Sequence, residues 1–106
     1  MRALVGIVVL LAMPAAAHDG DDALSAWYRS LVSNDGKSCC SMRDCMPAEA
    51  RLRNGGWEIL MATASGSVRW FAVPPEAVLR RENADGRPIL CRVGDVIRCF
   101  VPPSGA

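Results

Sequence analysis

Five cysteines in a chain of 106 residues constrain this fold more than any other feature. A chain of this length holds one small domain, whose hydrophobic core alone gives marginal stability. Small domains that mature in an oxidising compartment are commonly stabilised by disulfide bonds. The cysteines form a close-set group of three and a pair near the C-terminus: Cys39, Cys40, Cys45, Cys91 and Cys99. What they do therefore depends on where the protein folds.

The start of the chain has the pattern of a secretory signal peptide. Arg2 gives it a positive charge, residues 3–13 form an uninterrupted apolar run, and residues 15–17 are the small alanines that a signal peptidase requires. As a helix this run would cover only about 16 Å, about half of the hydrocarbon thickness of a membrane. We therefore expect residues 1–17 to be cleaved off. Residues 18–106 would form a single small disulfide-bonded domain in the periplasm or outside the cell, with no stable membrane span.

The charge balance argues against one class of function. Lys and Arg number 12 against 11 Asp and Glu, which gives a net charge of +1. Cleavage would remove Arg2 and leave the mature chain nearly neutral. Because a nucleic-acid binder normally carries a strongly basic surface, we expect no nucleic-acid partner.

Export predicts two disulfides and one cysteine left over. Neighbouring Cys39 and Cys40 are poorly placed to bond each other, because adjacent residues reach disulfide geometry only with a strained peptide bond. A zinc site is disfavoured because the spacing lacks paired C-x2-C motifs and the single histidine, His18, lies near neither group of cysteines. The odd thiol would be left for a metal, for burial or for a partner chain, and the last case would give a disulfide-linked dimer.

One helix is expected after the signal peptide. Four large side chains recur at helical spacing and share one face: Leu24, Trp27, Tyr28 and Leu31. The pattern predicts a helix over residues 23–33, with Asp21 or Asp22 as its N-cap and an end at residues 34–36. Residues 38–47 have neither helical nor strand periodicity, and we expect a loop held by its cysteines.

Two β-hairpins are expected in the second half of the chain. Alternation over residues 57–63 and 68–73 predicts the first, with Thr63 opposite Val68 and an apolar face that receives the helix. Prolines at 74 and 75 predict a turn or a single helical turn through Leu79, followed by a polar loop over residues 80–88. Residues 89–93 and 96–101 would form the second hairpin.

The register of the second hairpin decides how its two cysteines can pair. A two-residue loop would place Cys91 and Cys99 on different faces of the hairpin. A three-residue loop would place them directly opposite each other, and we favour this register because it separates apolar from charged side chains better. They would then bond either each other or the cysteines of residues 39–45. The sequence thus predicts an α+β fold, a small disulfide-stabilised domain with one N-terminal helix packed on two antiparallel β-hairpins.

A resemblance to known proteins rests on a series of motifs. These are the Trp27-Tyr28 pair, the C-C-x4-C group with Arg43-Asp44 before its last cysteine, the V-P-P-E-A-V-L segment at 73–79, an Asp-Gly turn, and the closing R-C-F at 98–100. In these features the chain from Trp27 to Pro103 resembles uncharacterised small exported cysteine-containing proteins of Gram-negative bacteria, which have no assigned activity. The resemblance implies location and fold, and it implies no catalytic residue.

The new N-terminus is a candidate copper site. Cleavage would give His18 a free α-amine, and an amine together with its own imidazole can chelate Cu(II), with Asp19, Asp21 or Asp22 as oxygen donors. A second candidate is a soft Cu(I) site made by Met42, Cys45 and Met46. Disulfide formation would compete with that site for its thiol. The simpler interpretation of the aspartates is that they favour the N-terminus of the helix.

No pattern points to an enzyme. The cysteine spacing lacks the C-x-x-C of thiol oxidoreductases, and a Cys or Ser nucleophile would lack a nearby histidine base. Five arginines near the last hairpin could form a basic patch, or simply a solvated face: Arg80, Arg81, Arg87, Arg92 and Arg98. Trp27, Trp57 and Trp70 could line a ligand groove or fill the core. We expect a non-enzymatic binding or interaction protein for an unknown protein or small ligand, without a cofactor, and a periplasmic copper-binding protein using His18 as the alternative.

Overall fold

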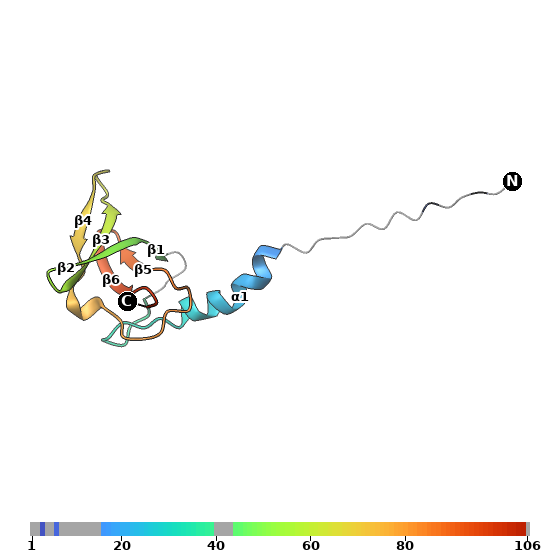
Figure 1. The fold of residues 1–106 in the computed structure, drawn as a ribbon, viewed down its shortest axis with the longest axis horizontal. Helices are drawn as coiled ribbons and strands as arrows, with labels where there is room; N and C mark the ends of the chain where they lie inside the picture. The colour runs from blue at the N-terminus through green and yellow to red at the C-terminus, as the bar shows by residue number, and fades with distance from the viewer. Residues whose placement is uncertain (1–2, 4–5, 7–15, 40–43, 106) are drawn as a thin grey trace.

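The computed structural model describes residues 3, 6, 16–39 and 44–105, with only the backbone for residues 16–22 (Figure 1). It has one α-helix and two antiparallel three-stranded sheets. The first sheet has the order β1-β5-β6, from β1 (Cys45–Pro47), β5 (Ile89–Val93) and β6 (Val96–Val101). The second has the order β2-β3-β4, from β2 (Glu49–Arg53), β3 (Gly56–Ala62) and β4 (Val68–Ala72). The predicted α+β class is confirmed.

The helix α1 (Ala16–Arg29) presents the expected face to the core. Trp27 and Leu31 are buried, and Leu24 and Tyr28 pack against the same cluster. The predicted bounds are wrong, because the helix begins before residue 23 and ends at Arg29. Beyond that end, the Ser30 hydroxyl donates to the carbonyl of Trp27. Cleavage after Ala17 would remove only the first two of the 14 residues in this helix.

Residues 34–36 form a turn rather than a helix end. Val32 and Ser38 pair in an isolated antiparallel bridge. Gly36 lies between them at φ +87°, a left-handed conformation that glycine adopts without strain. This turn brings the chain back toward the sheet, so that Cys39 is buried beside Leu31.

The sheet β1-β5-β6 is the middle layer, with an apolar cluster on each face. On one face lie Ile89, Cys91, Cys99 and Val101, which share a cluster with Trp27 and Leu31. On the other face Leu90 and Phe100 pack with Ile59 and Met61 of β3. Burial of both faces explains why Ile89-Leu90-Cys91 and Cys99-Phe100-Val101 are apolar without alternation.

This layering corrects the expected position of the helix. The helical side chains belong to the cluster on the β5–β6 hairpin, and the apolar face of β3 belongs to the cluster on the far side of that hairpin. The face of β3 and β4 that was expected to receive the helix therefore packs against β5 and β6 instead. The prediction failed because the β5–β6 hairpin is buried on both faces and therefore packs against two elements, the helix and the β2-β3-β4 sheet. Alternation in β3 and β4 shows which of their faces is apolar, but it does not show which element covers that face.

Both hairpin registers differ from the sequence prediction. In the first, Ala62 pairs with Val68, and the Thr63 N–H donates to the carbonyl of Ser67. The loop therefore has three residues, closed by Gly66 at φ +94°, and the pairing is one residue away from the expected Thr63–Val68 register. As a result Ile59 lies opposite Phe71 instead of Ala72.

In the second hairpin the structure combines the two expected alternatives. Val93 pairs with Val96 across a two-residue loop, yet Cys91 still lies opposite Cys99. A β-bulge at Arg98 supplies the extra residue that reconciles these two pairings. Because of the bulge, Ile97 packs with the Leu90 cluster, on the face of the hairpin opposite the cysteines.

Two strands were not predicted. β1 lies within the segment that we expected to be a loop, and it pairs with β5 so that Cys45 lies opposite Cys91. β2 forms a hairpin with β3 around Asn54 and Gly55, which both have positive φ (53° and 80°). Asn-Gly is a strong signal for a two-residue hairpin turn, so the sequence did contain the evidence for β2.

The expected turn after the double proline is confirmed as the 3-10 helix η1 (Pro75–Ala77). Immediately after it, Val78 pairs with Phe100 in a parallel bridge. The Leu79 N–H donates to the carbonyl of Phe100. This segment therefore covers part of the outer edge of β6.

Candidate binding surface

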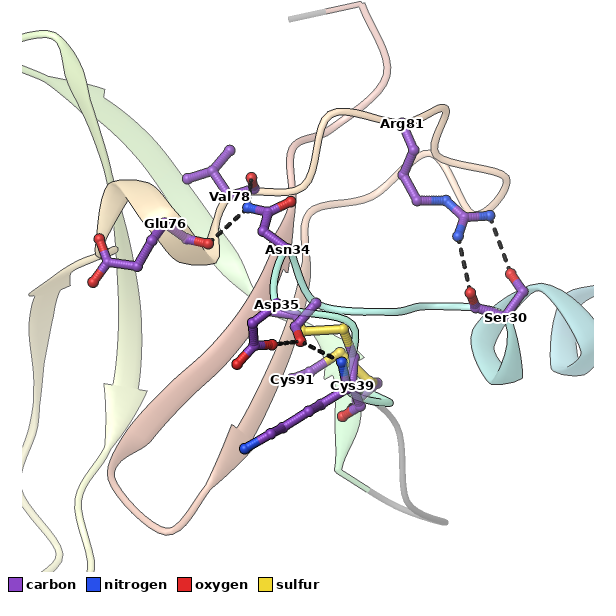
Figure 2. The surroundings of a disulfide bond; sticks show 12 residues. Ser30, Asn34, Asp35, Cys39, Glu76, Val78, Arg81 and Cys91 are labelled. Atoms are coloured by element: carbon purple, nitrogen blue, oxygen red, sulfur yellow. Dashed lines mark hydrogen bonds between the residues drawn. A yellow bond between two sulfur atoms is a disulfide. The ribbon is translucent and has the colours of Figure 1, made fainter.

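Two disulfides join the first part of the domain to the β5–β6 hairpin (Figure 2). Cys39 bonds Cys99 and Cys45 bonds Cys91, across 60 and 46 residues of sequence. Of the two pairings that the sequence left open, the structure has the one in which the two C-terminal cysteines bond the earlier group, and they do not bond each other. Both bridges belong to the cluster on the helix side of the middle sheet. They are therefore part of the core.

Cys40 lies outside the described residues. The other four cysteines of the chain are paired with one another, so no cysteine of the same chain is left for it. Both described disulfides are intramolecular. A disulfide-linked dimer would have to use Cys40 and stays a prediction.

The predicted copper site is not within the described side chains. The backbone of His18 and Asp19 lies in α1, and nothing is described of their side chains. Among the side chains that the structure does describe, no three His, Cys, Asp or Glu residues gather to hold a metal ion. For the soft site, Met42 lies outside the described residues, and the sulfur of Cys45 is bonded to Cys91. Copper chelation at His18 stays a prediction.

Three of the five clustered arginines act within the fold. Arg81 donates to the carbonyl and the hydroxyl of Ser30, both at 3.1 Å. Arg92 donates to the carbonyl of Ala62 at 2.8 Å, which joins the β5–β6 hairpin to the β3–β4 hairpin. Arg87 pairs with Asp85 at 2.6 Å. These contacts argue against one shared basic patch, and they also give three arginines a structural role that the solvated-face interpretation did not predict.

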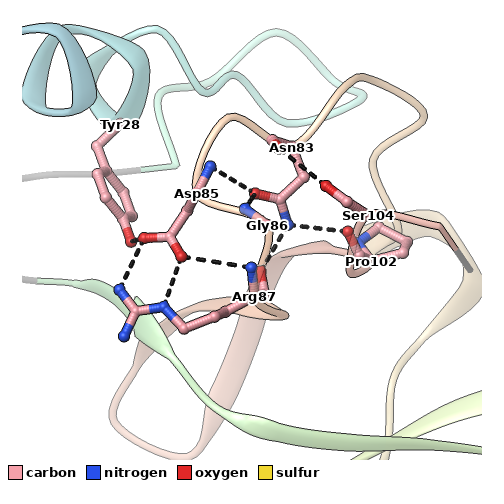
Figure 3. A network of polar contacts seen from close by, with 7 residues as sticks. All are labelled: Tyr28, Asn83, Asp85, Gly86, Arg87, Pro102 and Ser104. Carbon is pink, nitrogen blue, oxygen red and sulfur yellow. Dashed lines mark hydrogen bonds and ion pairs between the residues drawn. The ribbon is translucent and has the colours of Figure 1, made fainter.

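Asp85 is the centre of a polar network that ties three parts of the chain together (Figure 3). Tyr28 of α1 donates to its carboxylate at 2.9 Å, and Arg87 forms three hydrogen bonds with it, two from its guanidinium and one from its backbone N–H. The hydrogen bonds from Arg87, helped by the one from Tyr28, lower the pKa of Asp85 to about 2. Asn83 donates to the carbonyl of Pro102 and so fixes the C-terminal segment to the same loop.

The three tryptophans do not form a shared groove. Trp27 lies in the cluster on the helix side of the middle sheet, whereas Trp57 packs against Phe100 on the other side, with ring centroids 5.4 Å apart. Trp70 lies on the outer face of the β2-β3-β4 sheet, under the guanidinium of Arg51 at 3.9 Å. Two of the three tryptophans thus contribute to the core, as the simpler interpretation predicted.

The surface of the described residues includes two shallow hollows of similar volume. One of about 450 Å³ lies between residues 78–83 and residues 102–105 and includes Arg80. The other, of about 490 Å³, lies between the turn at residues 33–35, η1 and the start of β6, and it includes Arg98. Neither hollow brings together side chains that would carry out a known reaction.

The clearest surface is the outer edge of β4, which Figure 1 shows at the margin of the molecule remote from α1. The Thr63–Ser67 and Trp57–Val73 hydrogen bonds fix the alternation of the β3–β4 ladder. They show that odd-numbered residues of β4 direct their backbone N–H and C=O groups toward β3. The backbone groups of the even-numbered residues, Val68, Trp70 and Ala72, therefore point away from the sheet. Within the described residues no other strand pairs with this edge.

The edges at β2 and β6 are better protected. β2, at the opposite edge of the same sheet, has three charged residues among its five: Glu49, Arg51 and Arg53. β6 is partly covered by Val78 and Leu79. Natural proteins protect edge strands in these two ways, because an unprotected strand pairs with other chains. β4, with the sequence Val-Arg-Trp-Phe-Ala, carries a single charge.

The outer face next to this edge is held in place by side-chain contacts. The Arg51 side chain from β2 donates to the Glu58 carboxylate of β3 at 2.8 Å and also stacks on the ring of Trp70. Because the Arg51 guanidinium donates to Glu58, it lies over β3, the middle strand of the sheet. The Trp70 ring stacks against the guanidinium at that position. The ring thus leans across the sheet and leaves the backbone edge of β4 open. Sequence alternation identified β4 as a strand, but it contains no information about which strand ends a sheet.

The comparisons with known proteins give no family for this chain. No protein-family model, curated protein or solved structure matches it. Its resemblance to exported cysteine-containing proteins therefore stays a prediction. The described part of the chain contains no helix that is long and apolar enough to span a membrane.

Proposed function

We propose that the mature chain is an exported, non-enzymatic interaction protein that binds an extended segment of a partner along the open edge of β4. The observation that carries this proposal is the unpaired row of backbone groups at Val68, Trp70 and Ala72 on a strand with one charge. Strand addition of this kind obtains its affinity from main-chain hydrogen bonds and its specificity from alternate side chains.

The rest of the molecule suits this role because it holds the edge rigidly. β4 is hydrogen-bonded to β3, and Arg92 and Asp95 of the β5–β6 hairpin bond the backbone of Ala62 and Ala64 at the far end of β3. The two disulfides fix the β5–β6 hairpin in turn. A preformed edge loses little conformational freedom on binding, which favours affinity.

A proline on each edge of the same sheet tests this proposal. Ala72→Pro removes an N–H that points out of the sheet, so it blocks strand addition and leaves the β3–β4 ladder intact. Leu52→Pro is the matched control, because the N–H of Leu52 points out from the opposite edge, at β2. The measurement is binding of the mature protein to an array of synthetic ten-residue peptides with alternating apolar and polar residues.

We expect the wild type and Leu52→Pro to bind the same subset of peptides. Ala72→Pro should bind them at least about tenfold more weakly, because it loses a backbone hydrogen bond and places a ring against the added strand. Binding that is equal in both proline variants, or no binding to any peptide by the monomeric protein, would contradict the proposal. Mass analysis of both disulfides in each variant shows that the fold is retained.

A further inference from the structure

We infer that the segment bound by β4 is β4 of a second copy of this chain, in an antiparallel pair related by a two-fold axis at Trp70. This inference rests on the proposed function and names its partner. The geometry that leads to it is the alternation of the backbone groups along β4, of which only those of the even-numbered residues point outward. Two copies can therefore pair only in registers that place even-numbered residues opposite even-numbered residues.

The two-fold register centred on Trp70 satisfies all three outward-pointing residues. Val68 of one copy would pair with Ala72 of the other, Trp70 with Trp70, and Ala72 with Val68. In an antiparallel ladder residues that direct their backbone groups toward each other form hydrogen-bonded pairs, so each of these three pairs would make two backbone hydrogen bonds. The result is a continuous six-stranded sheet built from two three-stranded ones.

The side chains favour this register over the one centred on Arg69. Centred on Trp70, the pairing places Arg69 of each copy opposite Phe71 of the other. Arg69 already lies over the Phe71 ring of its own strand at 4.9 Å, and a second ring next to the guanidinium is favourable. Centred on Arg69, the pairing would place two arginines directly opposite each other, which is destabilising.

The ends of the strand and the charge of the chain are also consistent with self-pairing. Residues 74 and 75 are prolines, which lack the N–H that a longer ladder would need, so the pairing is limited to the short segment around β4. The full chain carries a net charge of only +1, so two copies do not repel each other strongly. The two Trp70 residues would lie opposite each other at the axis, and each ring would stay stacked under the Arg51 of its own copy, clear of the new backbone hydrogen bonds.

Sedimentation velocity of the mature chain carrying Cys40→Ser tests this inference, because that substitution removes the disulfide-linked form of the dimer. We expect a reversible dimer whose dissociation constant rises at least about tenfold in Ala72→Pro, which loses one backbone donor from each copy, and stays unchanged in Leu52→Pro. With a photoreactive phenylalanine in place of Trp70, we expect crosslinks to residues 68–72 of the second copy.

The outcomes separate this inference from the proposed function. A chain that is monomeric at all concentrations but binds array peptides in an Ala72-dependent way overturns the second copy as partner and leaves strand addition standing. A monomer that also binds no peptide overturns both. A dimer that Ala72→Pro does not weaken, or whose crosslinks fall outside residues 68–72, uses another surface and also overturns the inference.

Discussion

Asp85 shows how one residue connects the helix to the rest of the domain. Its side chain is only 2% exposed, although its partner Arg87 is 64% exposed. The carboxylate accepts hydrogen bonds from Tyr28 and Arg87, and these bonds favour its charged form. Because Tyr28 belongs to α1, the charge of Asp85 contributes to holding the helix against the loop before β5.

The lowered pKa predicts a pH-dependent stability. Asp85 titrates near 2 in the folded chain and near its ordinary value of 3.8 when unfolded, so its contribution is present above about pH 4 and is lost as the pH falls through 2. Asp85→Asn should lower the free energy of unfolding at pH 7 by about 1–2 kcal/mol, after allowance for solvent screening at Arg87. Urea unfolding at pH 7 and pH 2 measures this. A difference between the two proteins that persists unchanged at pH 2 would contradict the assignment.

The β-bulge in β6 is the element that brings the two cysteines of the last hairpin into line. The two-residue loop alone would place Cys91 and Cys99 on opposite faces, where they could not both reach the segment beneath α1. The extra residue, Arg98, restores the shared face without changing the loop. The hairpin thus keeps a favourable turn together with a disulfide-compatible register.

Deleting Arg98 tests this role. Without it, the pairs Val93–Val96 and Arg92–Ile97 lead directly to Cys91–Cys99 in a regular ladder, so we expect both disulfides to form as in the wild type. Deleting Arg92 from β5 is the control, because it shifts Cys91 relative to Cys99 and should reduce native pairing. Peptide mapping under non-reducing conditions reports the outcome. Loss of native pairing in the Arg98 deletion would show that the bulge has another role.

The type of most helices and strands could be predicted from the sequence, but the registers of the strands and their order in the sheets could not. The helical face at Trp27, both predicted hairpins and η1 follow from local patterns, and the structure confirms them; Leu31 is buried as expected but lies beyond the end of α1. The registers do not follow from these patterns, because Gly66 closes a loop one residue shorter than expected and Arg98 adds a residue that alternation cannot reveal. Sheet order depends on contacts distant in sequence, so the open edge at β4 became visible only in the structure.

For the molecule as a whole, the two disulfides act as its main long-range constraints. They close loops of 60 and 46 residues. On the chain-entropy model, a disulfide that closes a loop of that length adds about 4 kcal/mol to the free energy of unfolding. Both bridges end on neighbouring positions of one hairpin, so they hold Cys39 and Cys45 against the middle layer together. A domain this small depends on such bridges because its apolar core is limited.

Mass mapping of the protein purified from the periplasm or the culture medium, without reduction, tests the exported and disulfide-bonded state most directly. We expect a chain that begins at His18, with Cys39 bonded to Cys99, Cys45 bonded to Cys91, and Cys40 outside both bridges. A chain that retains Met1 and has all five cysteines reduced would contradict it.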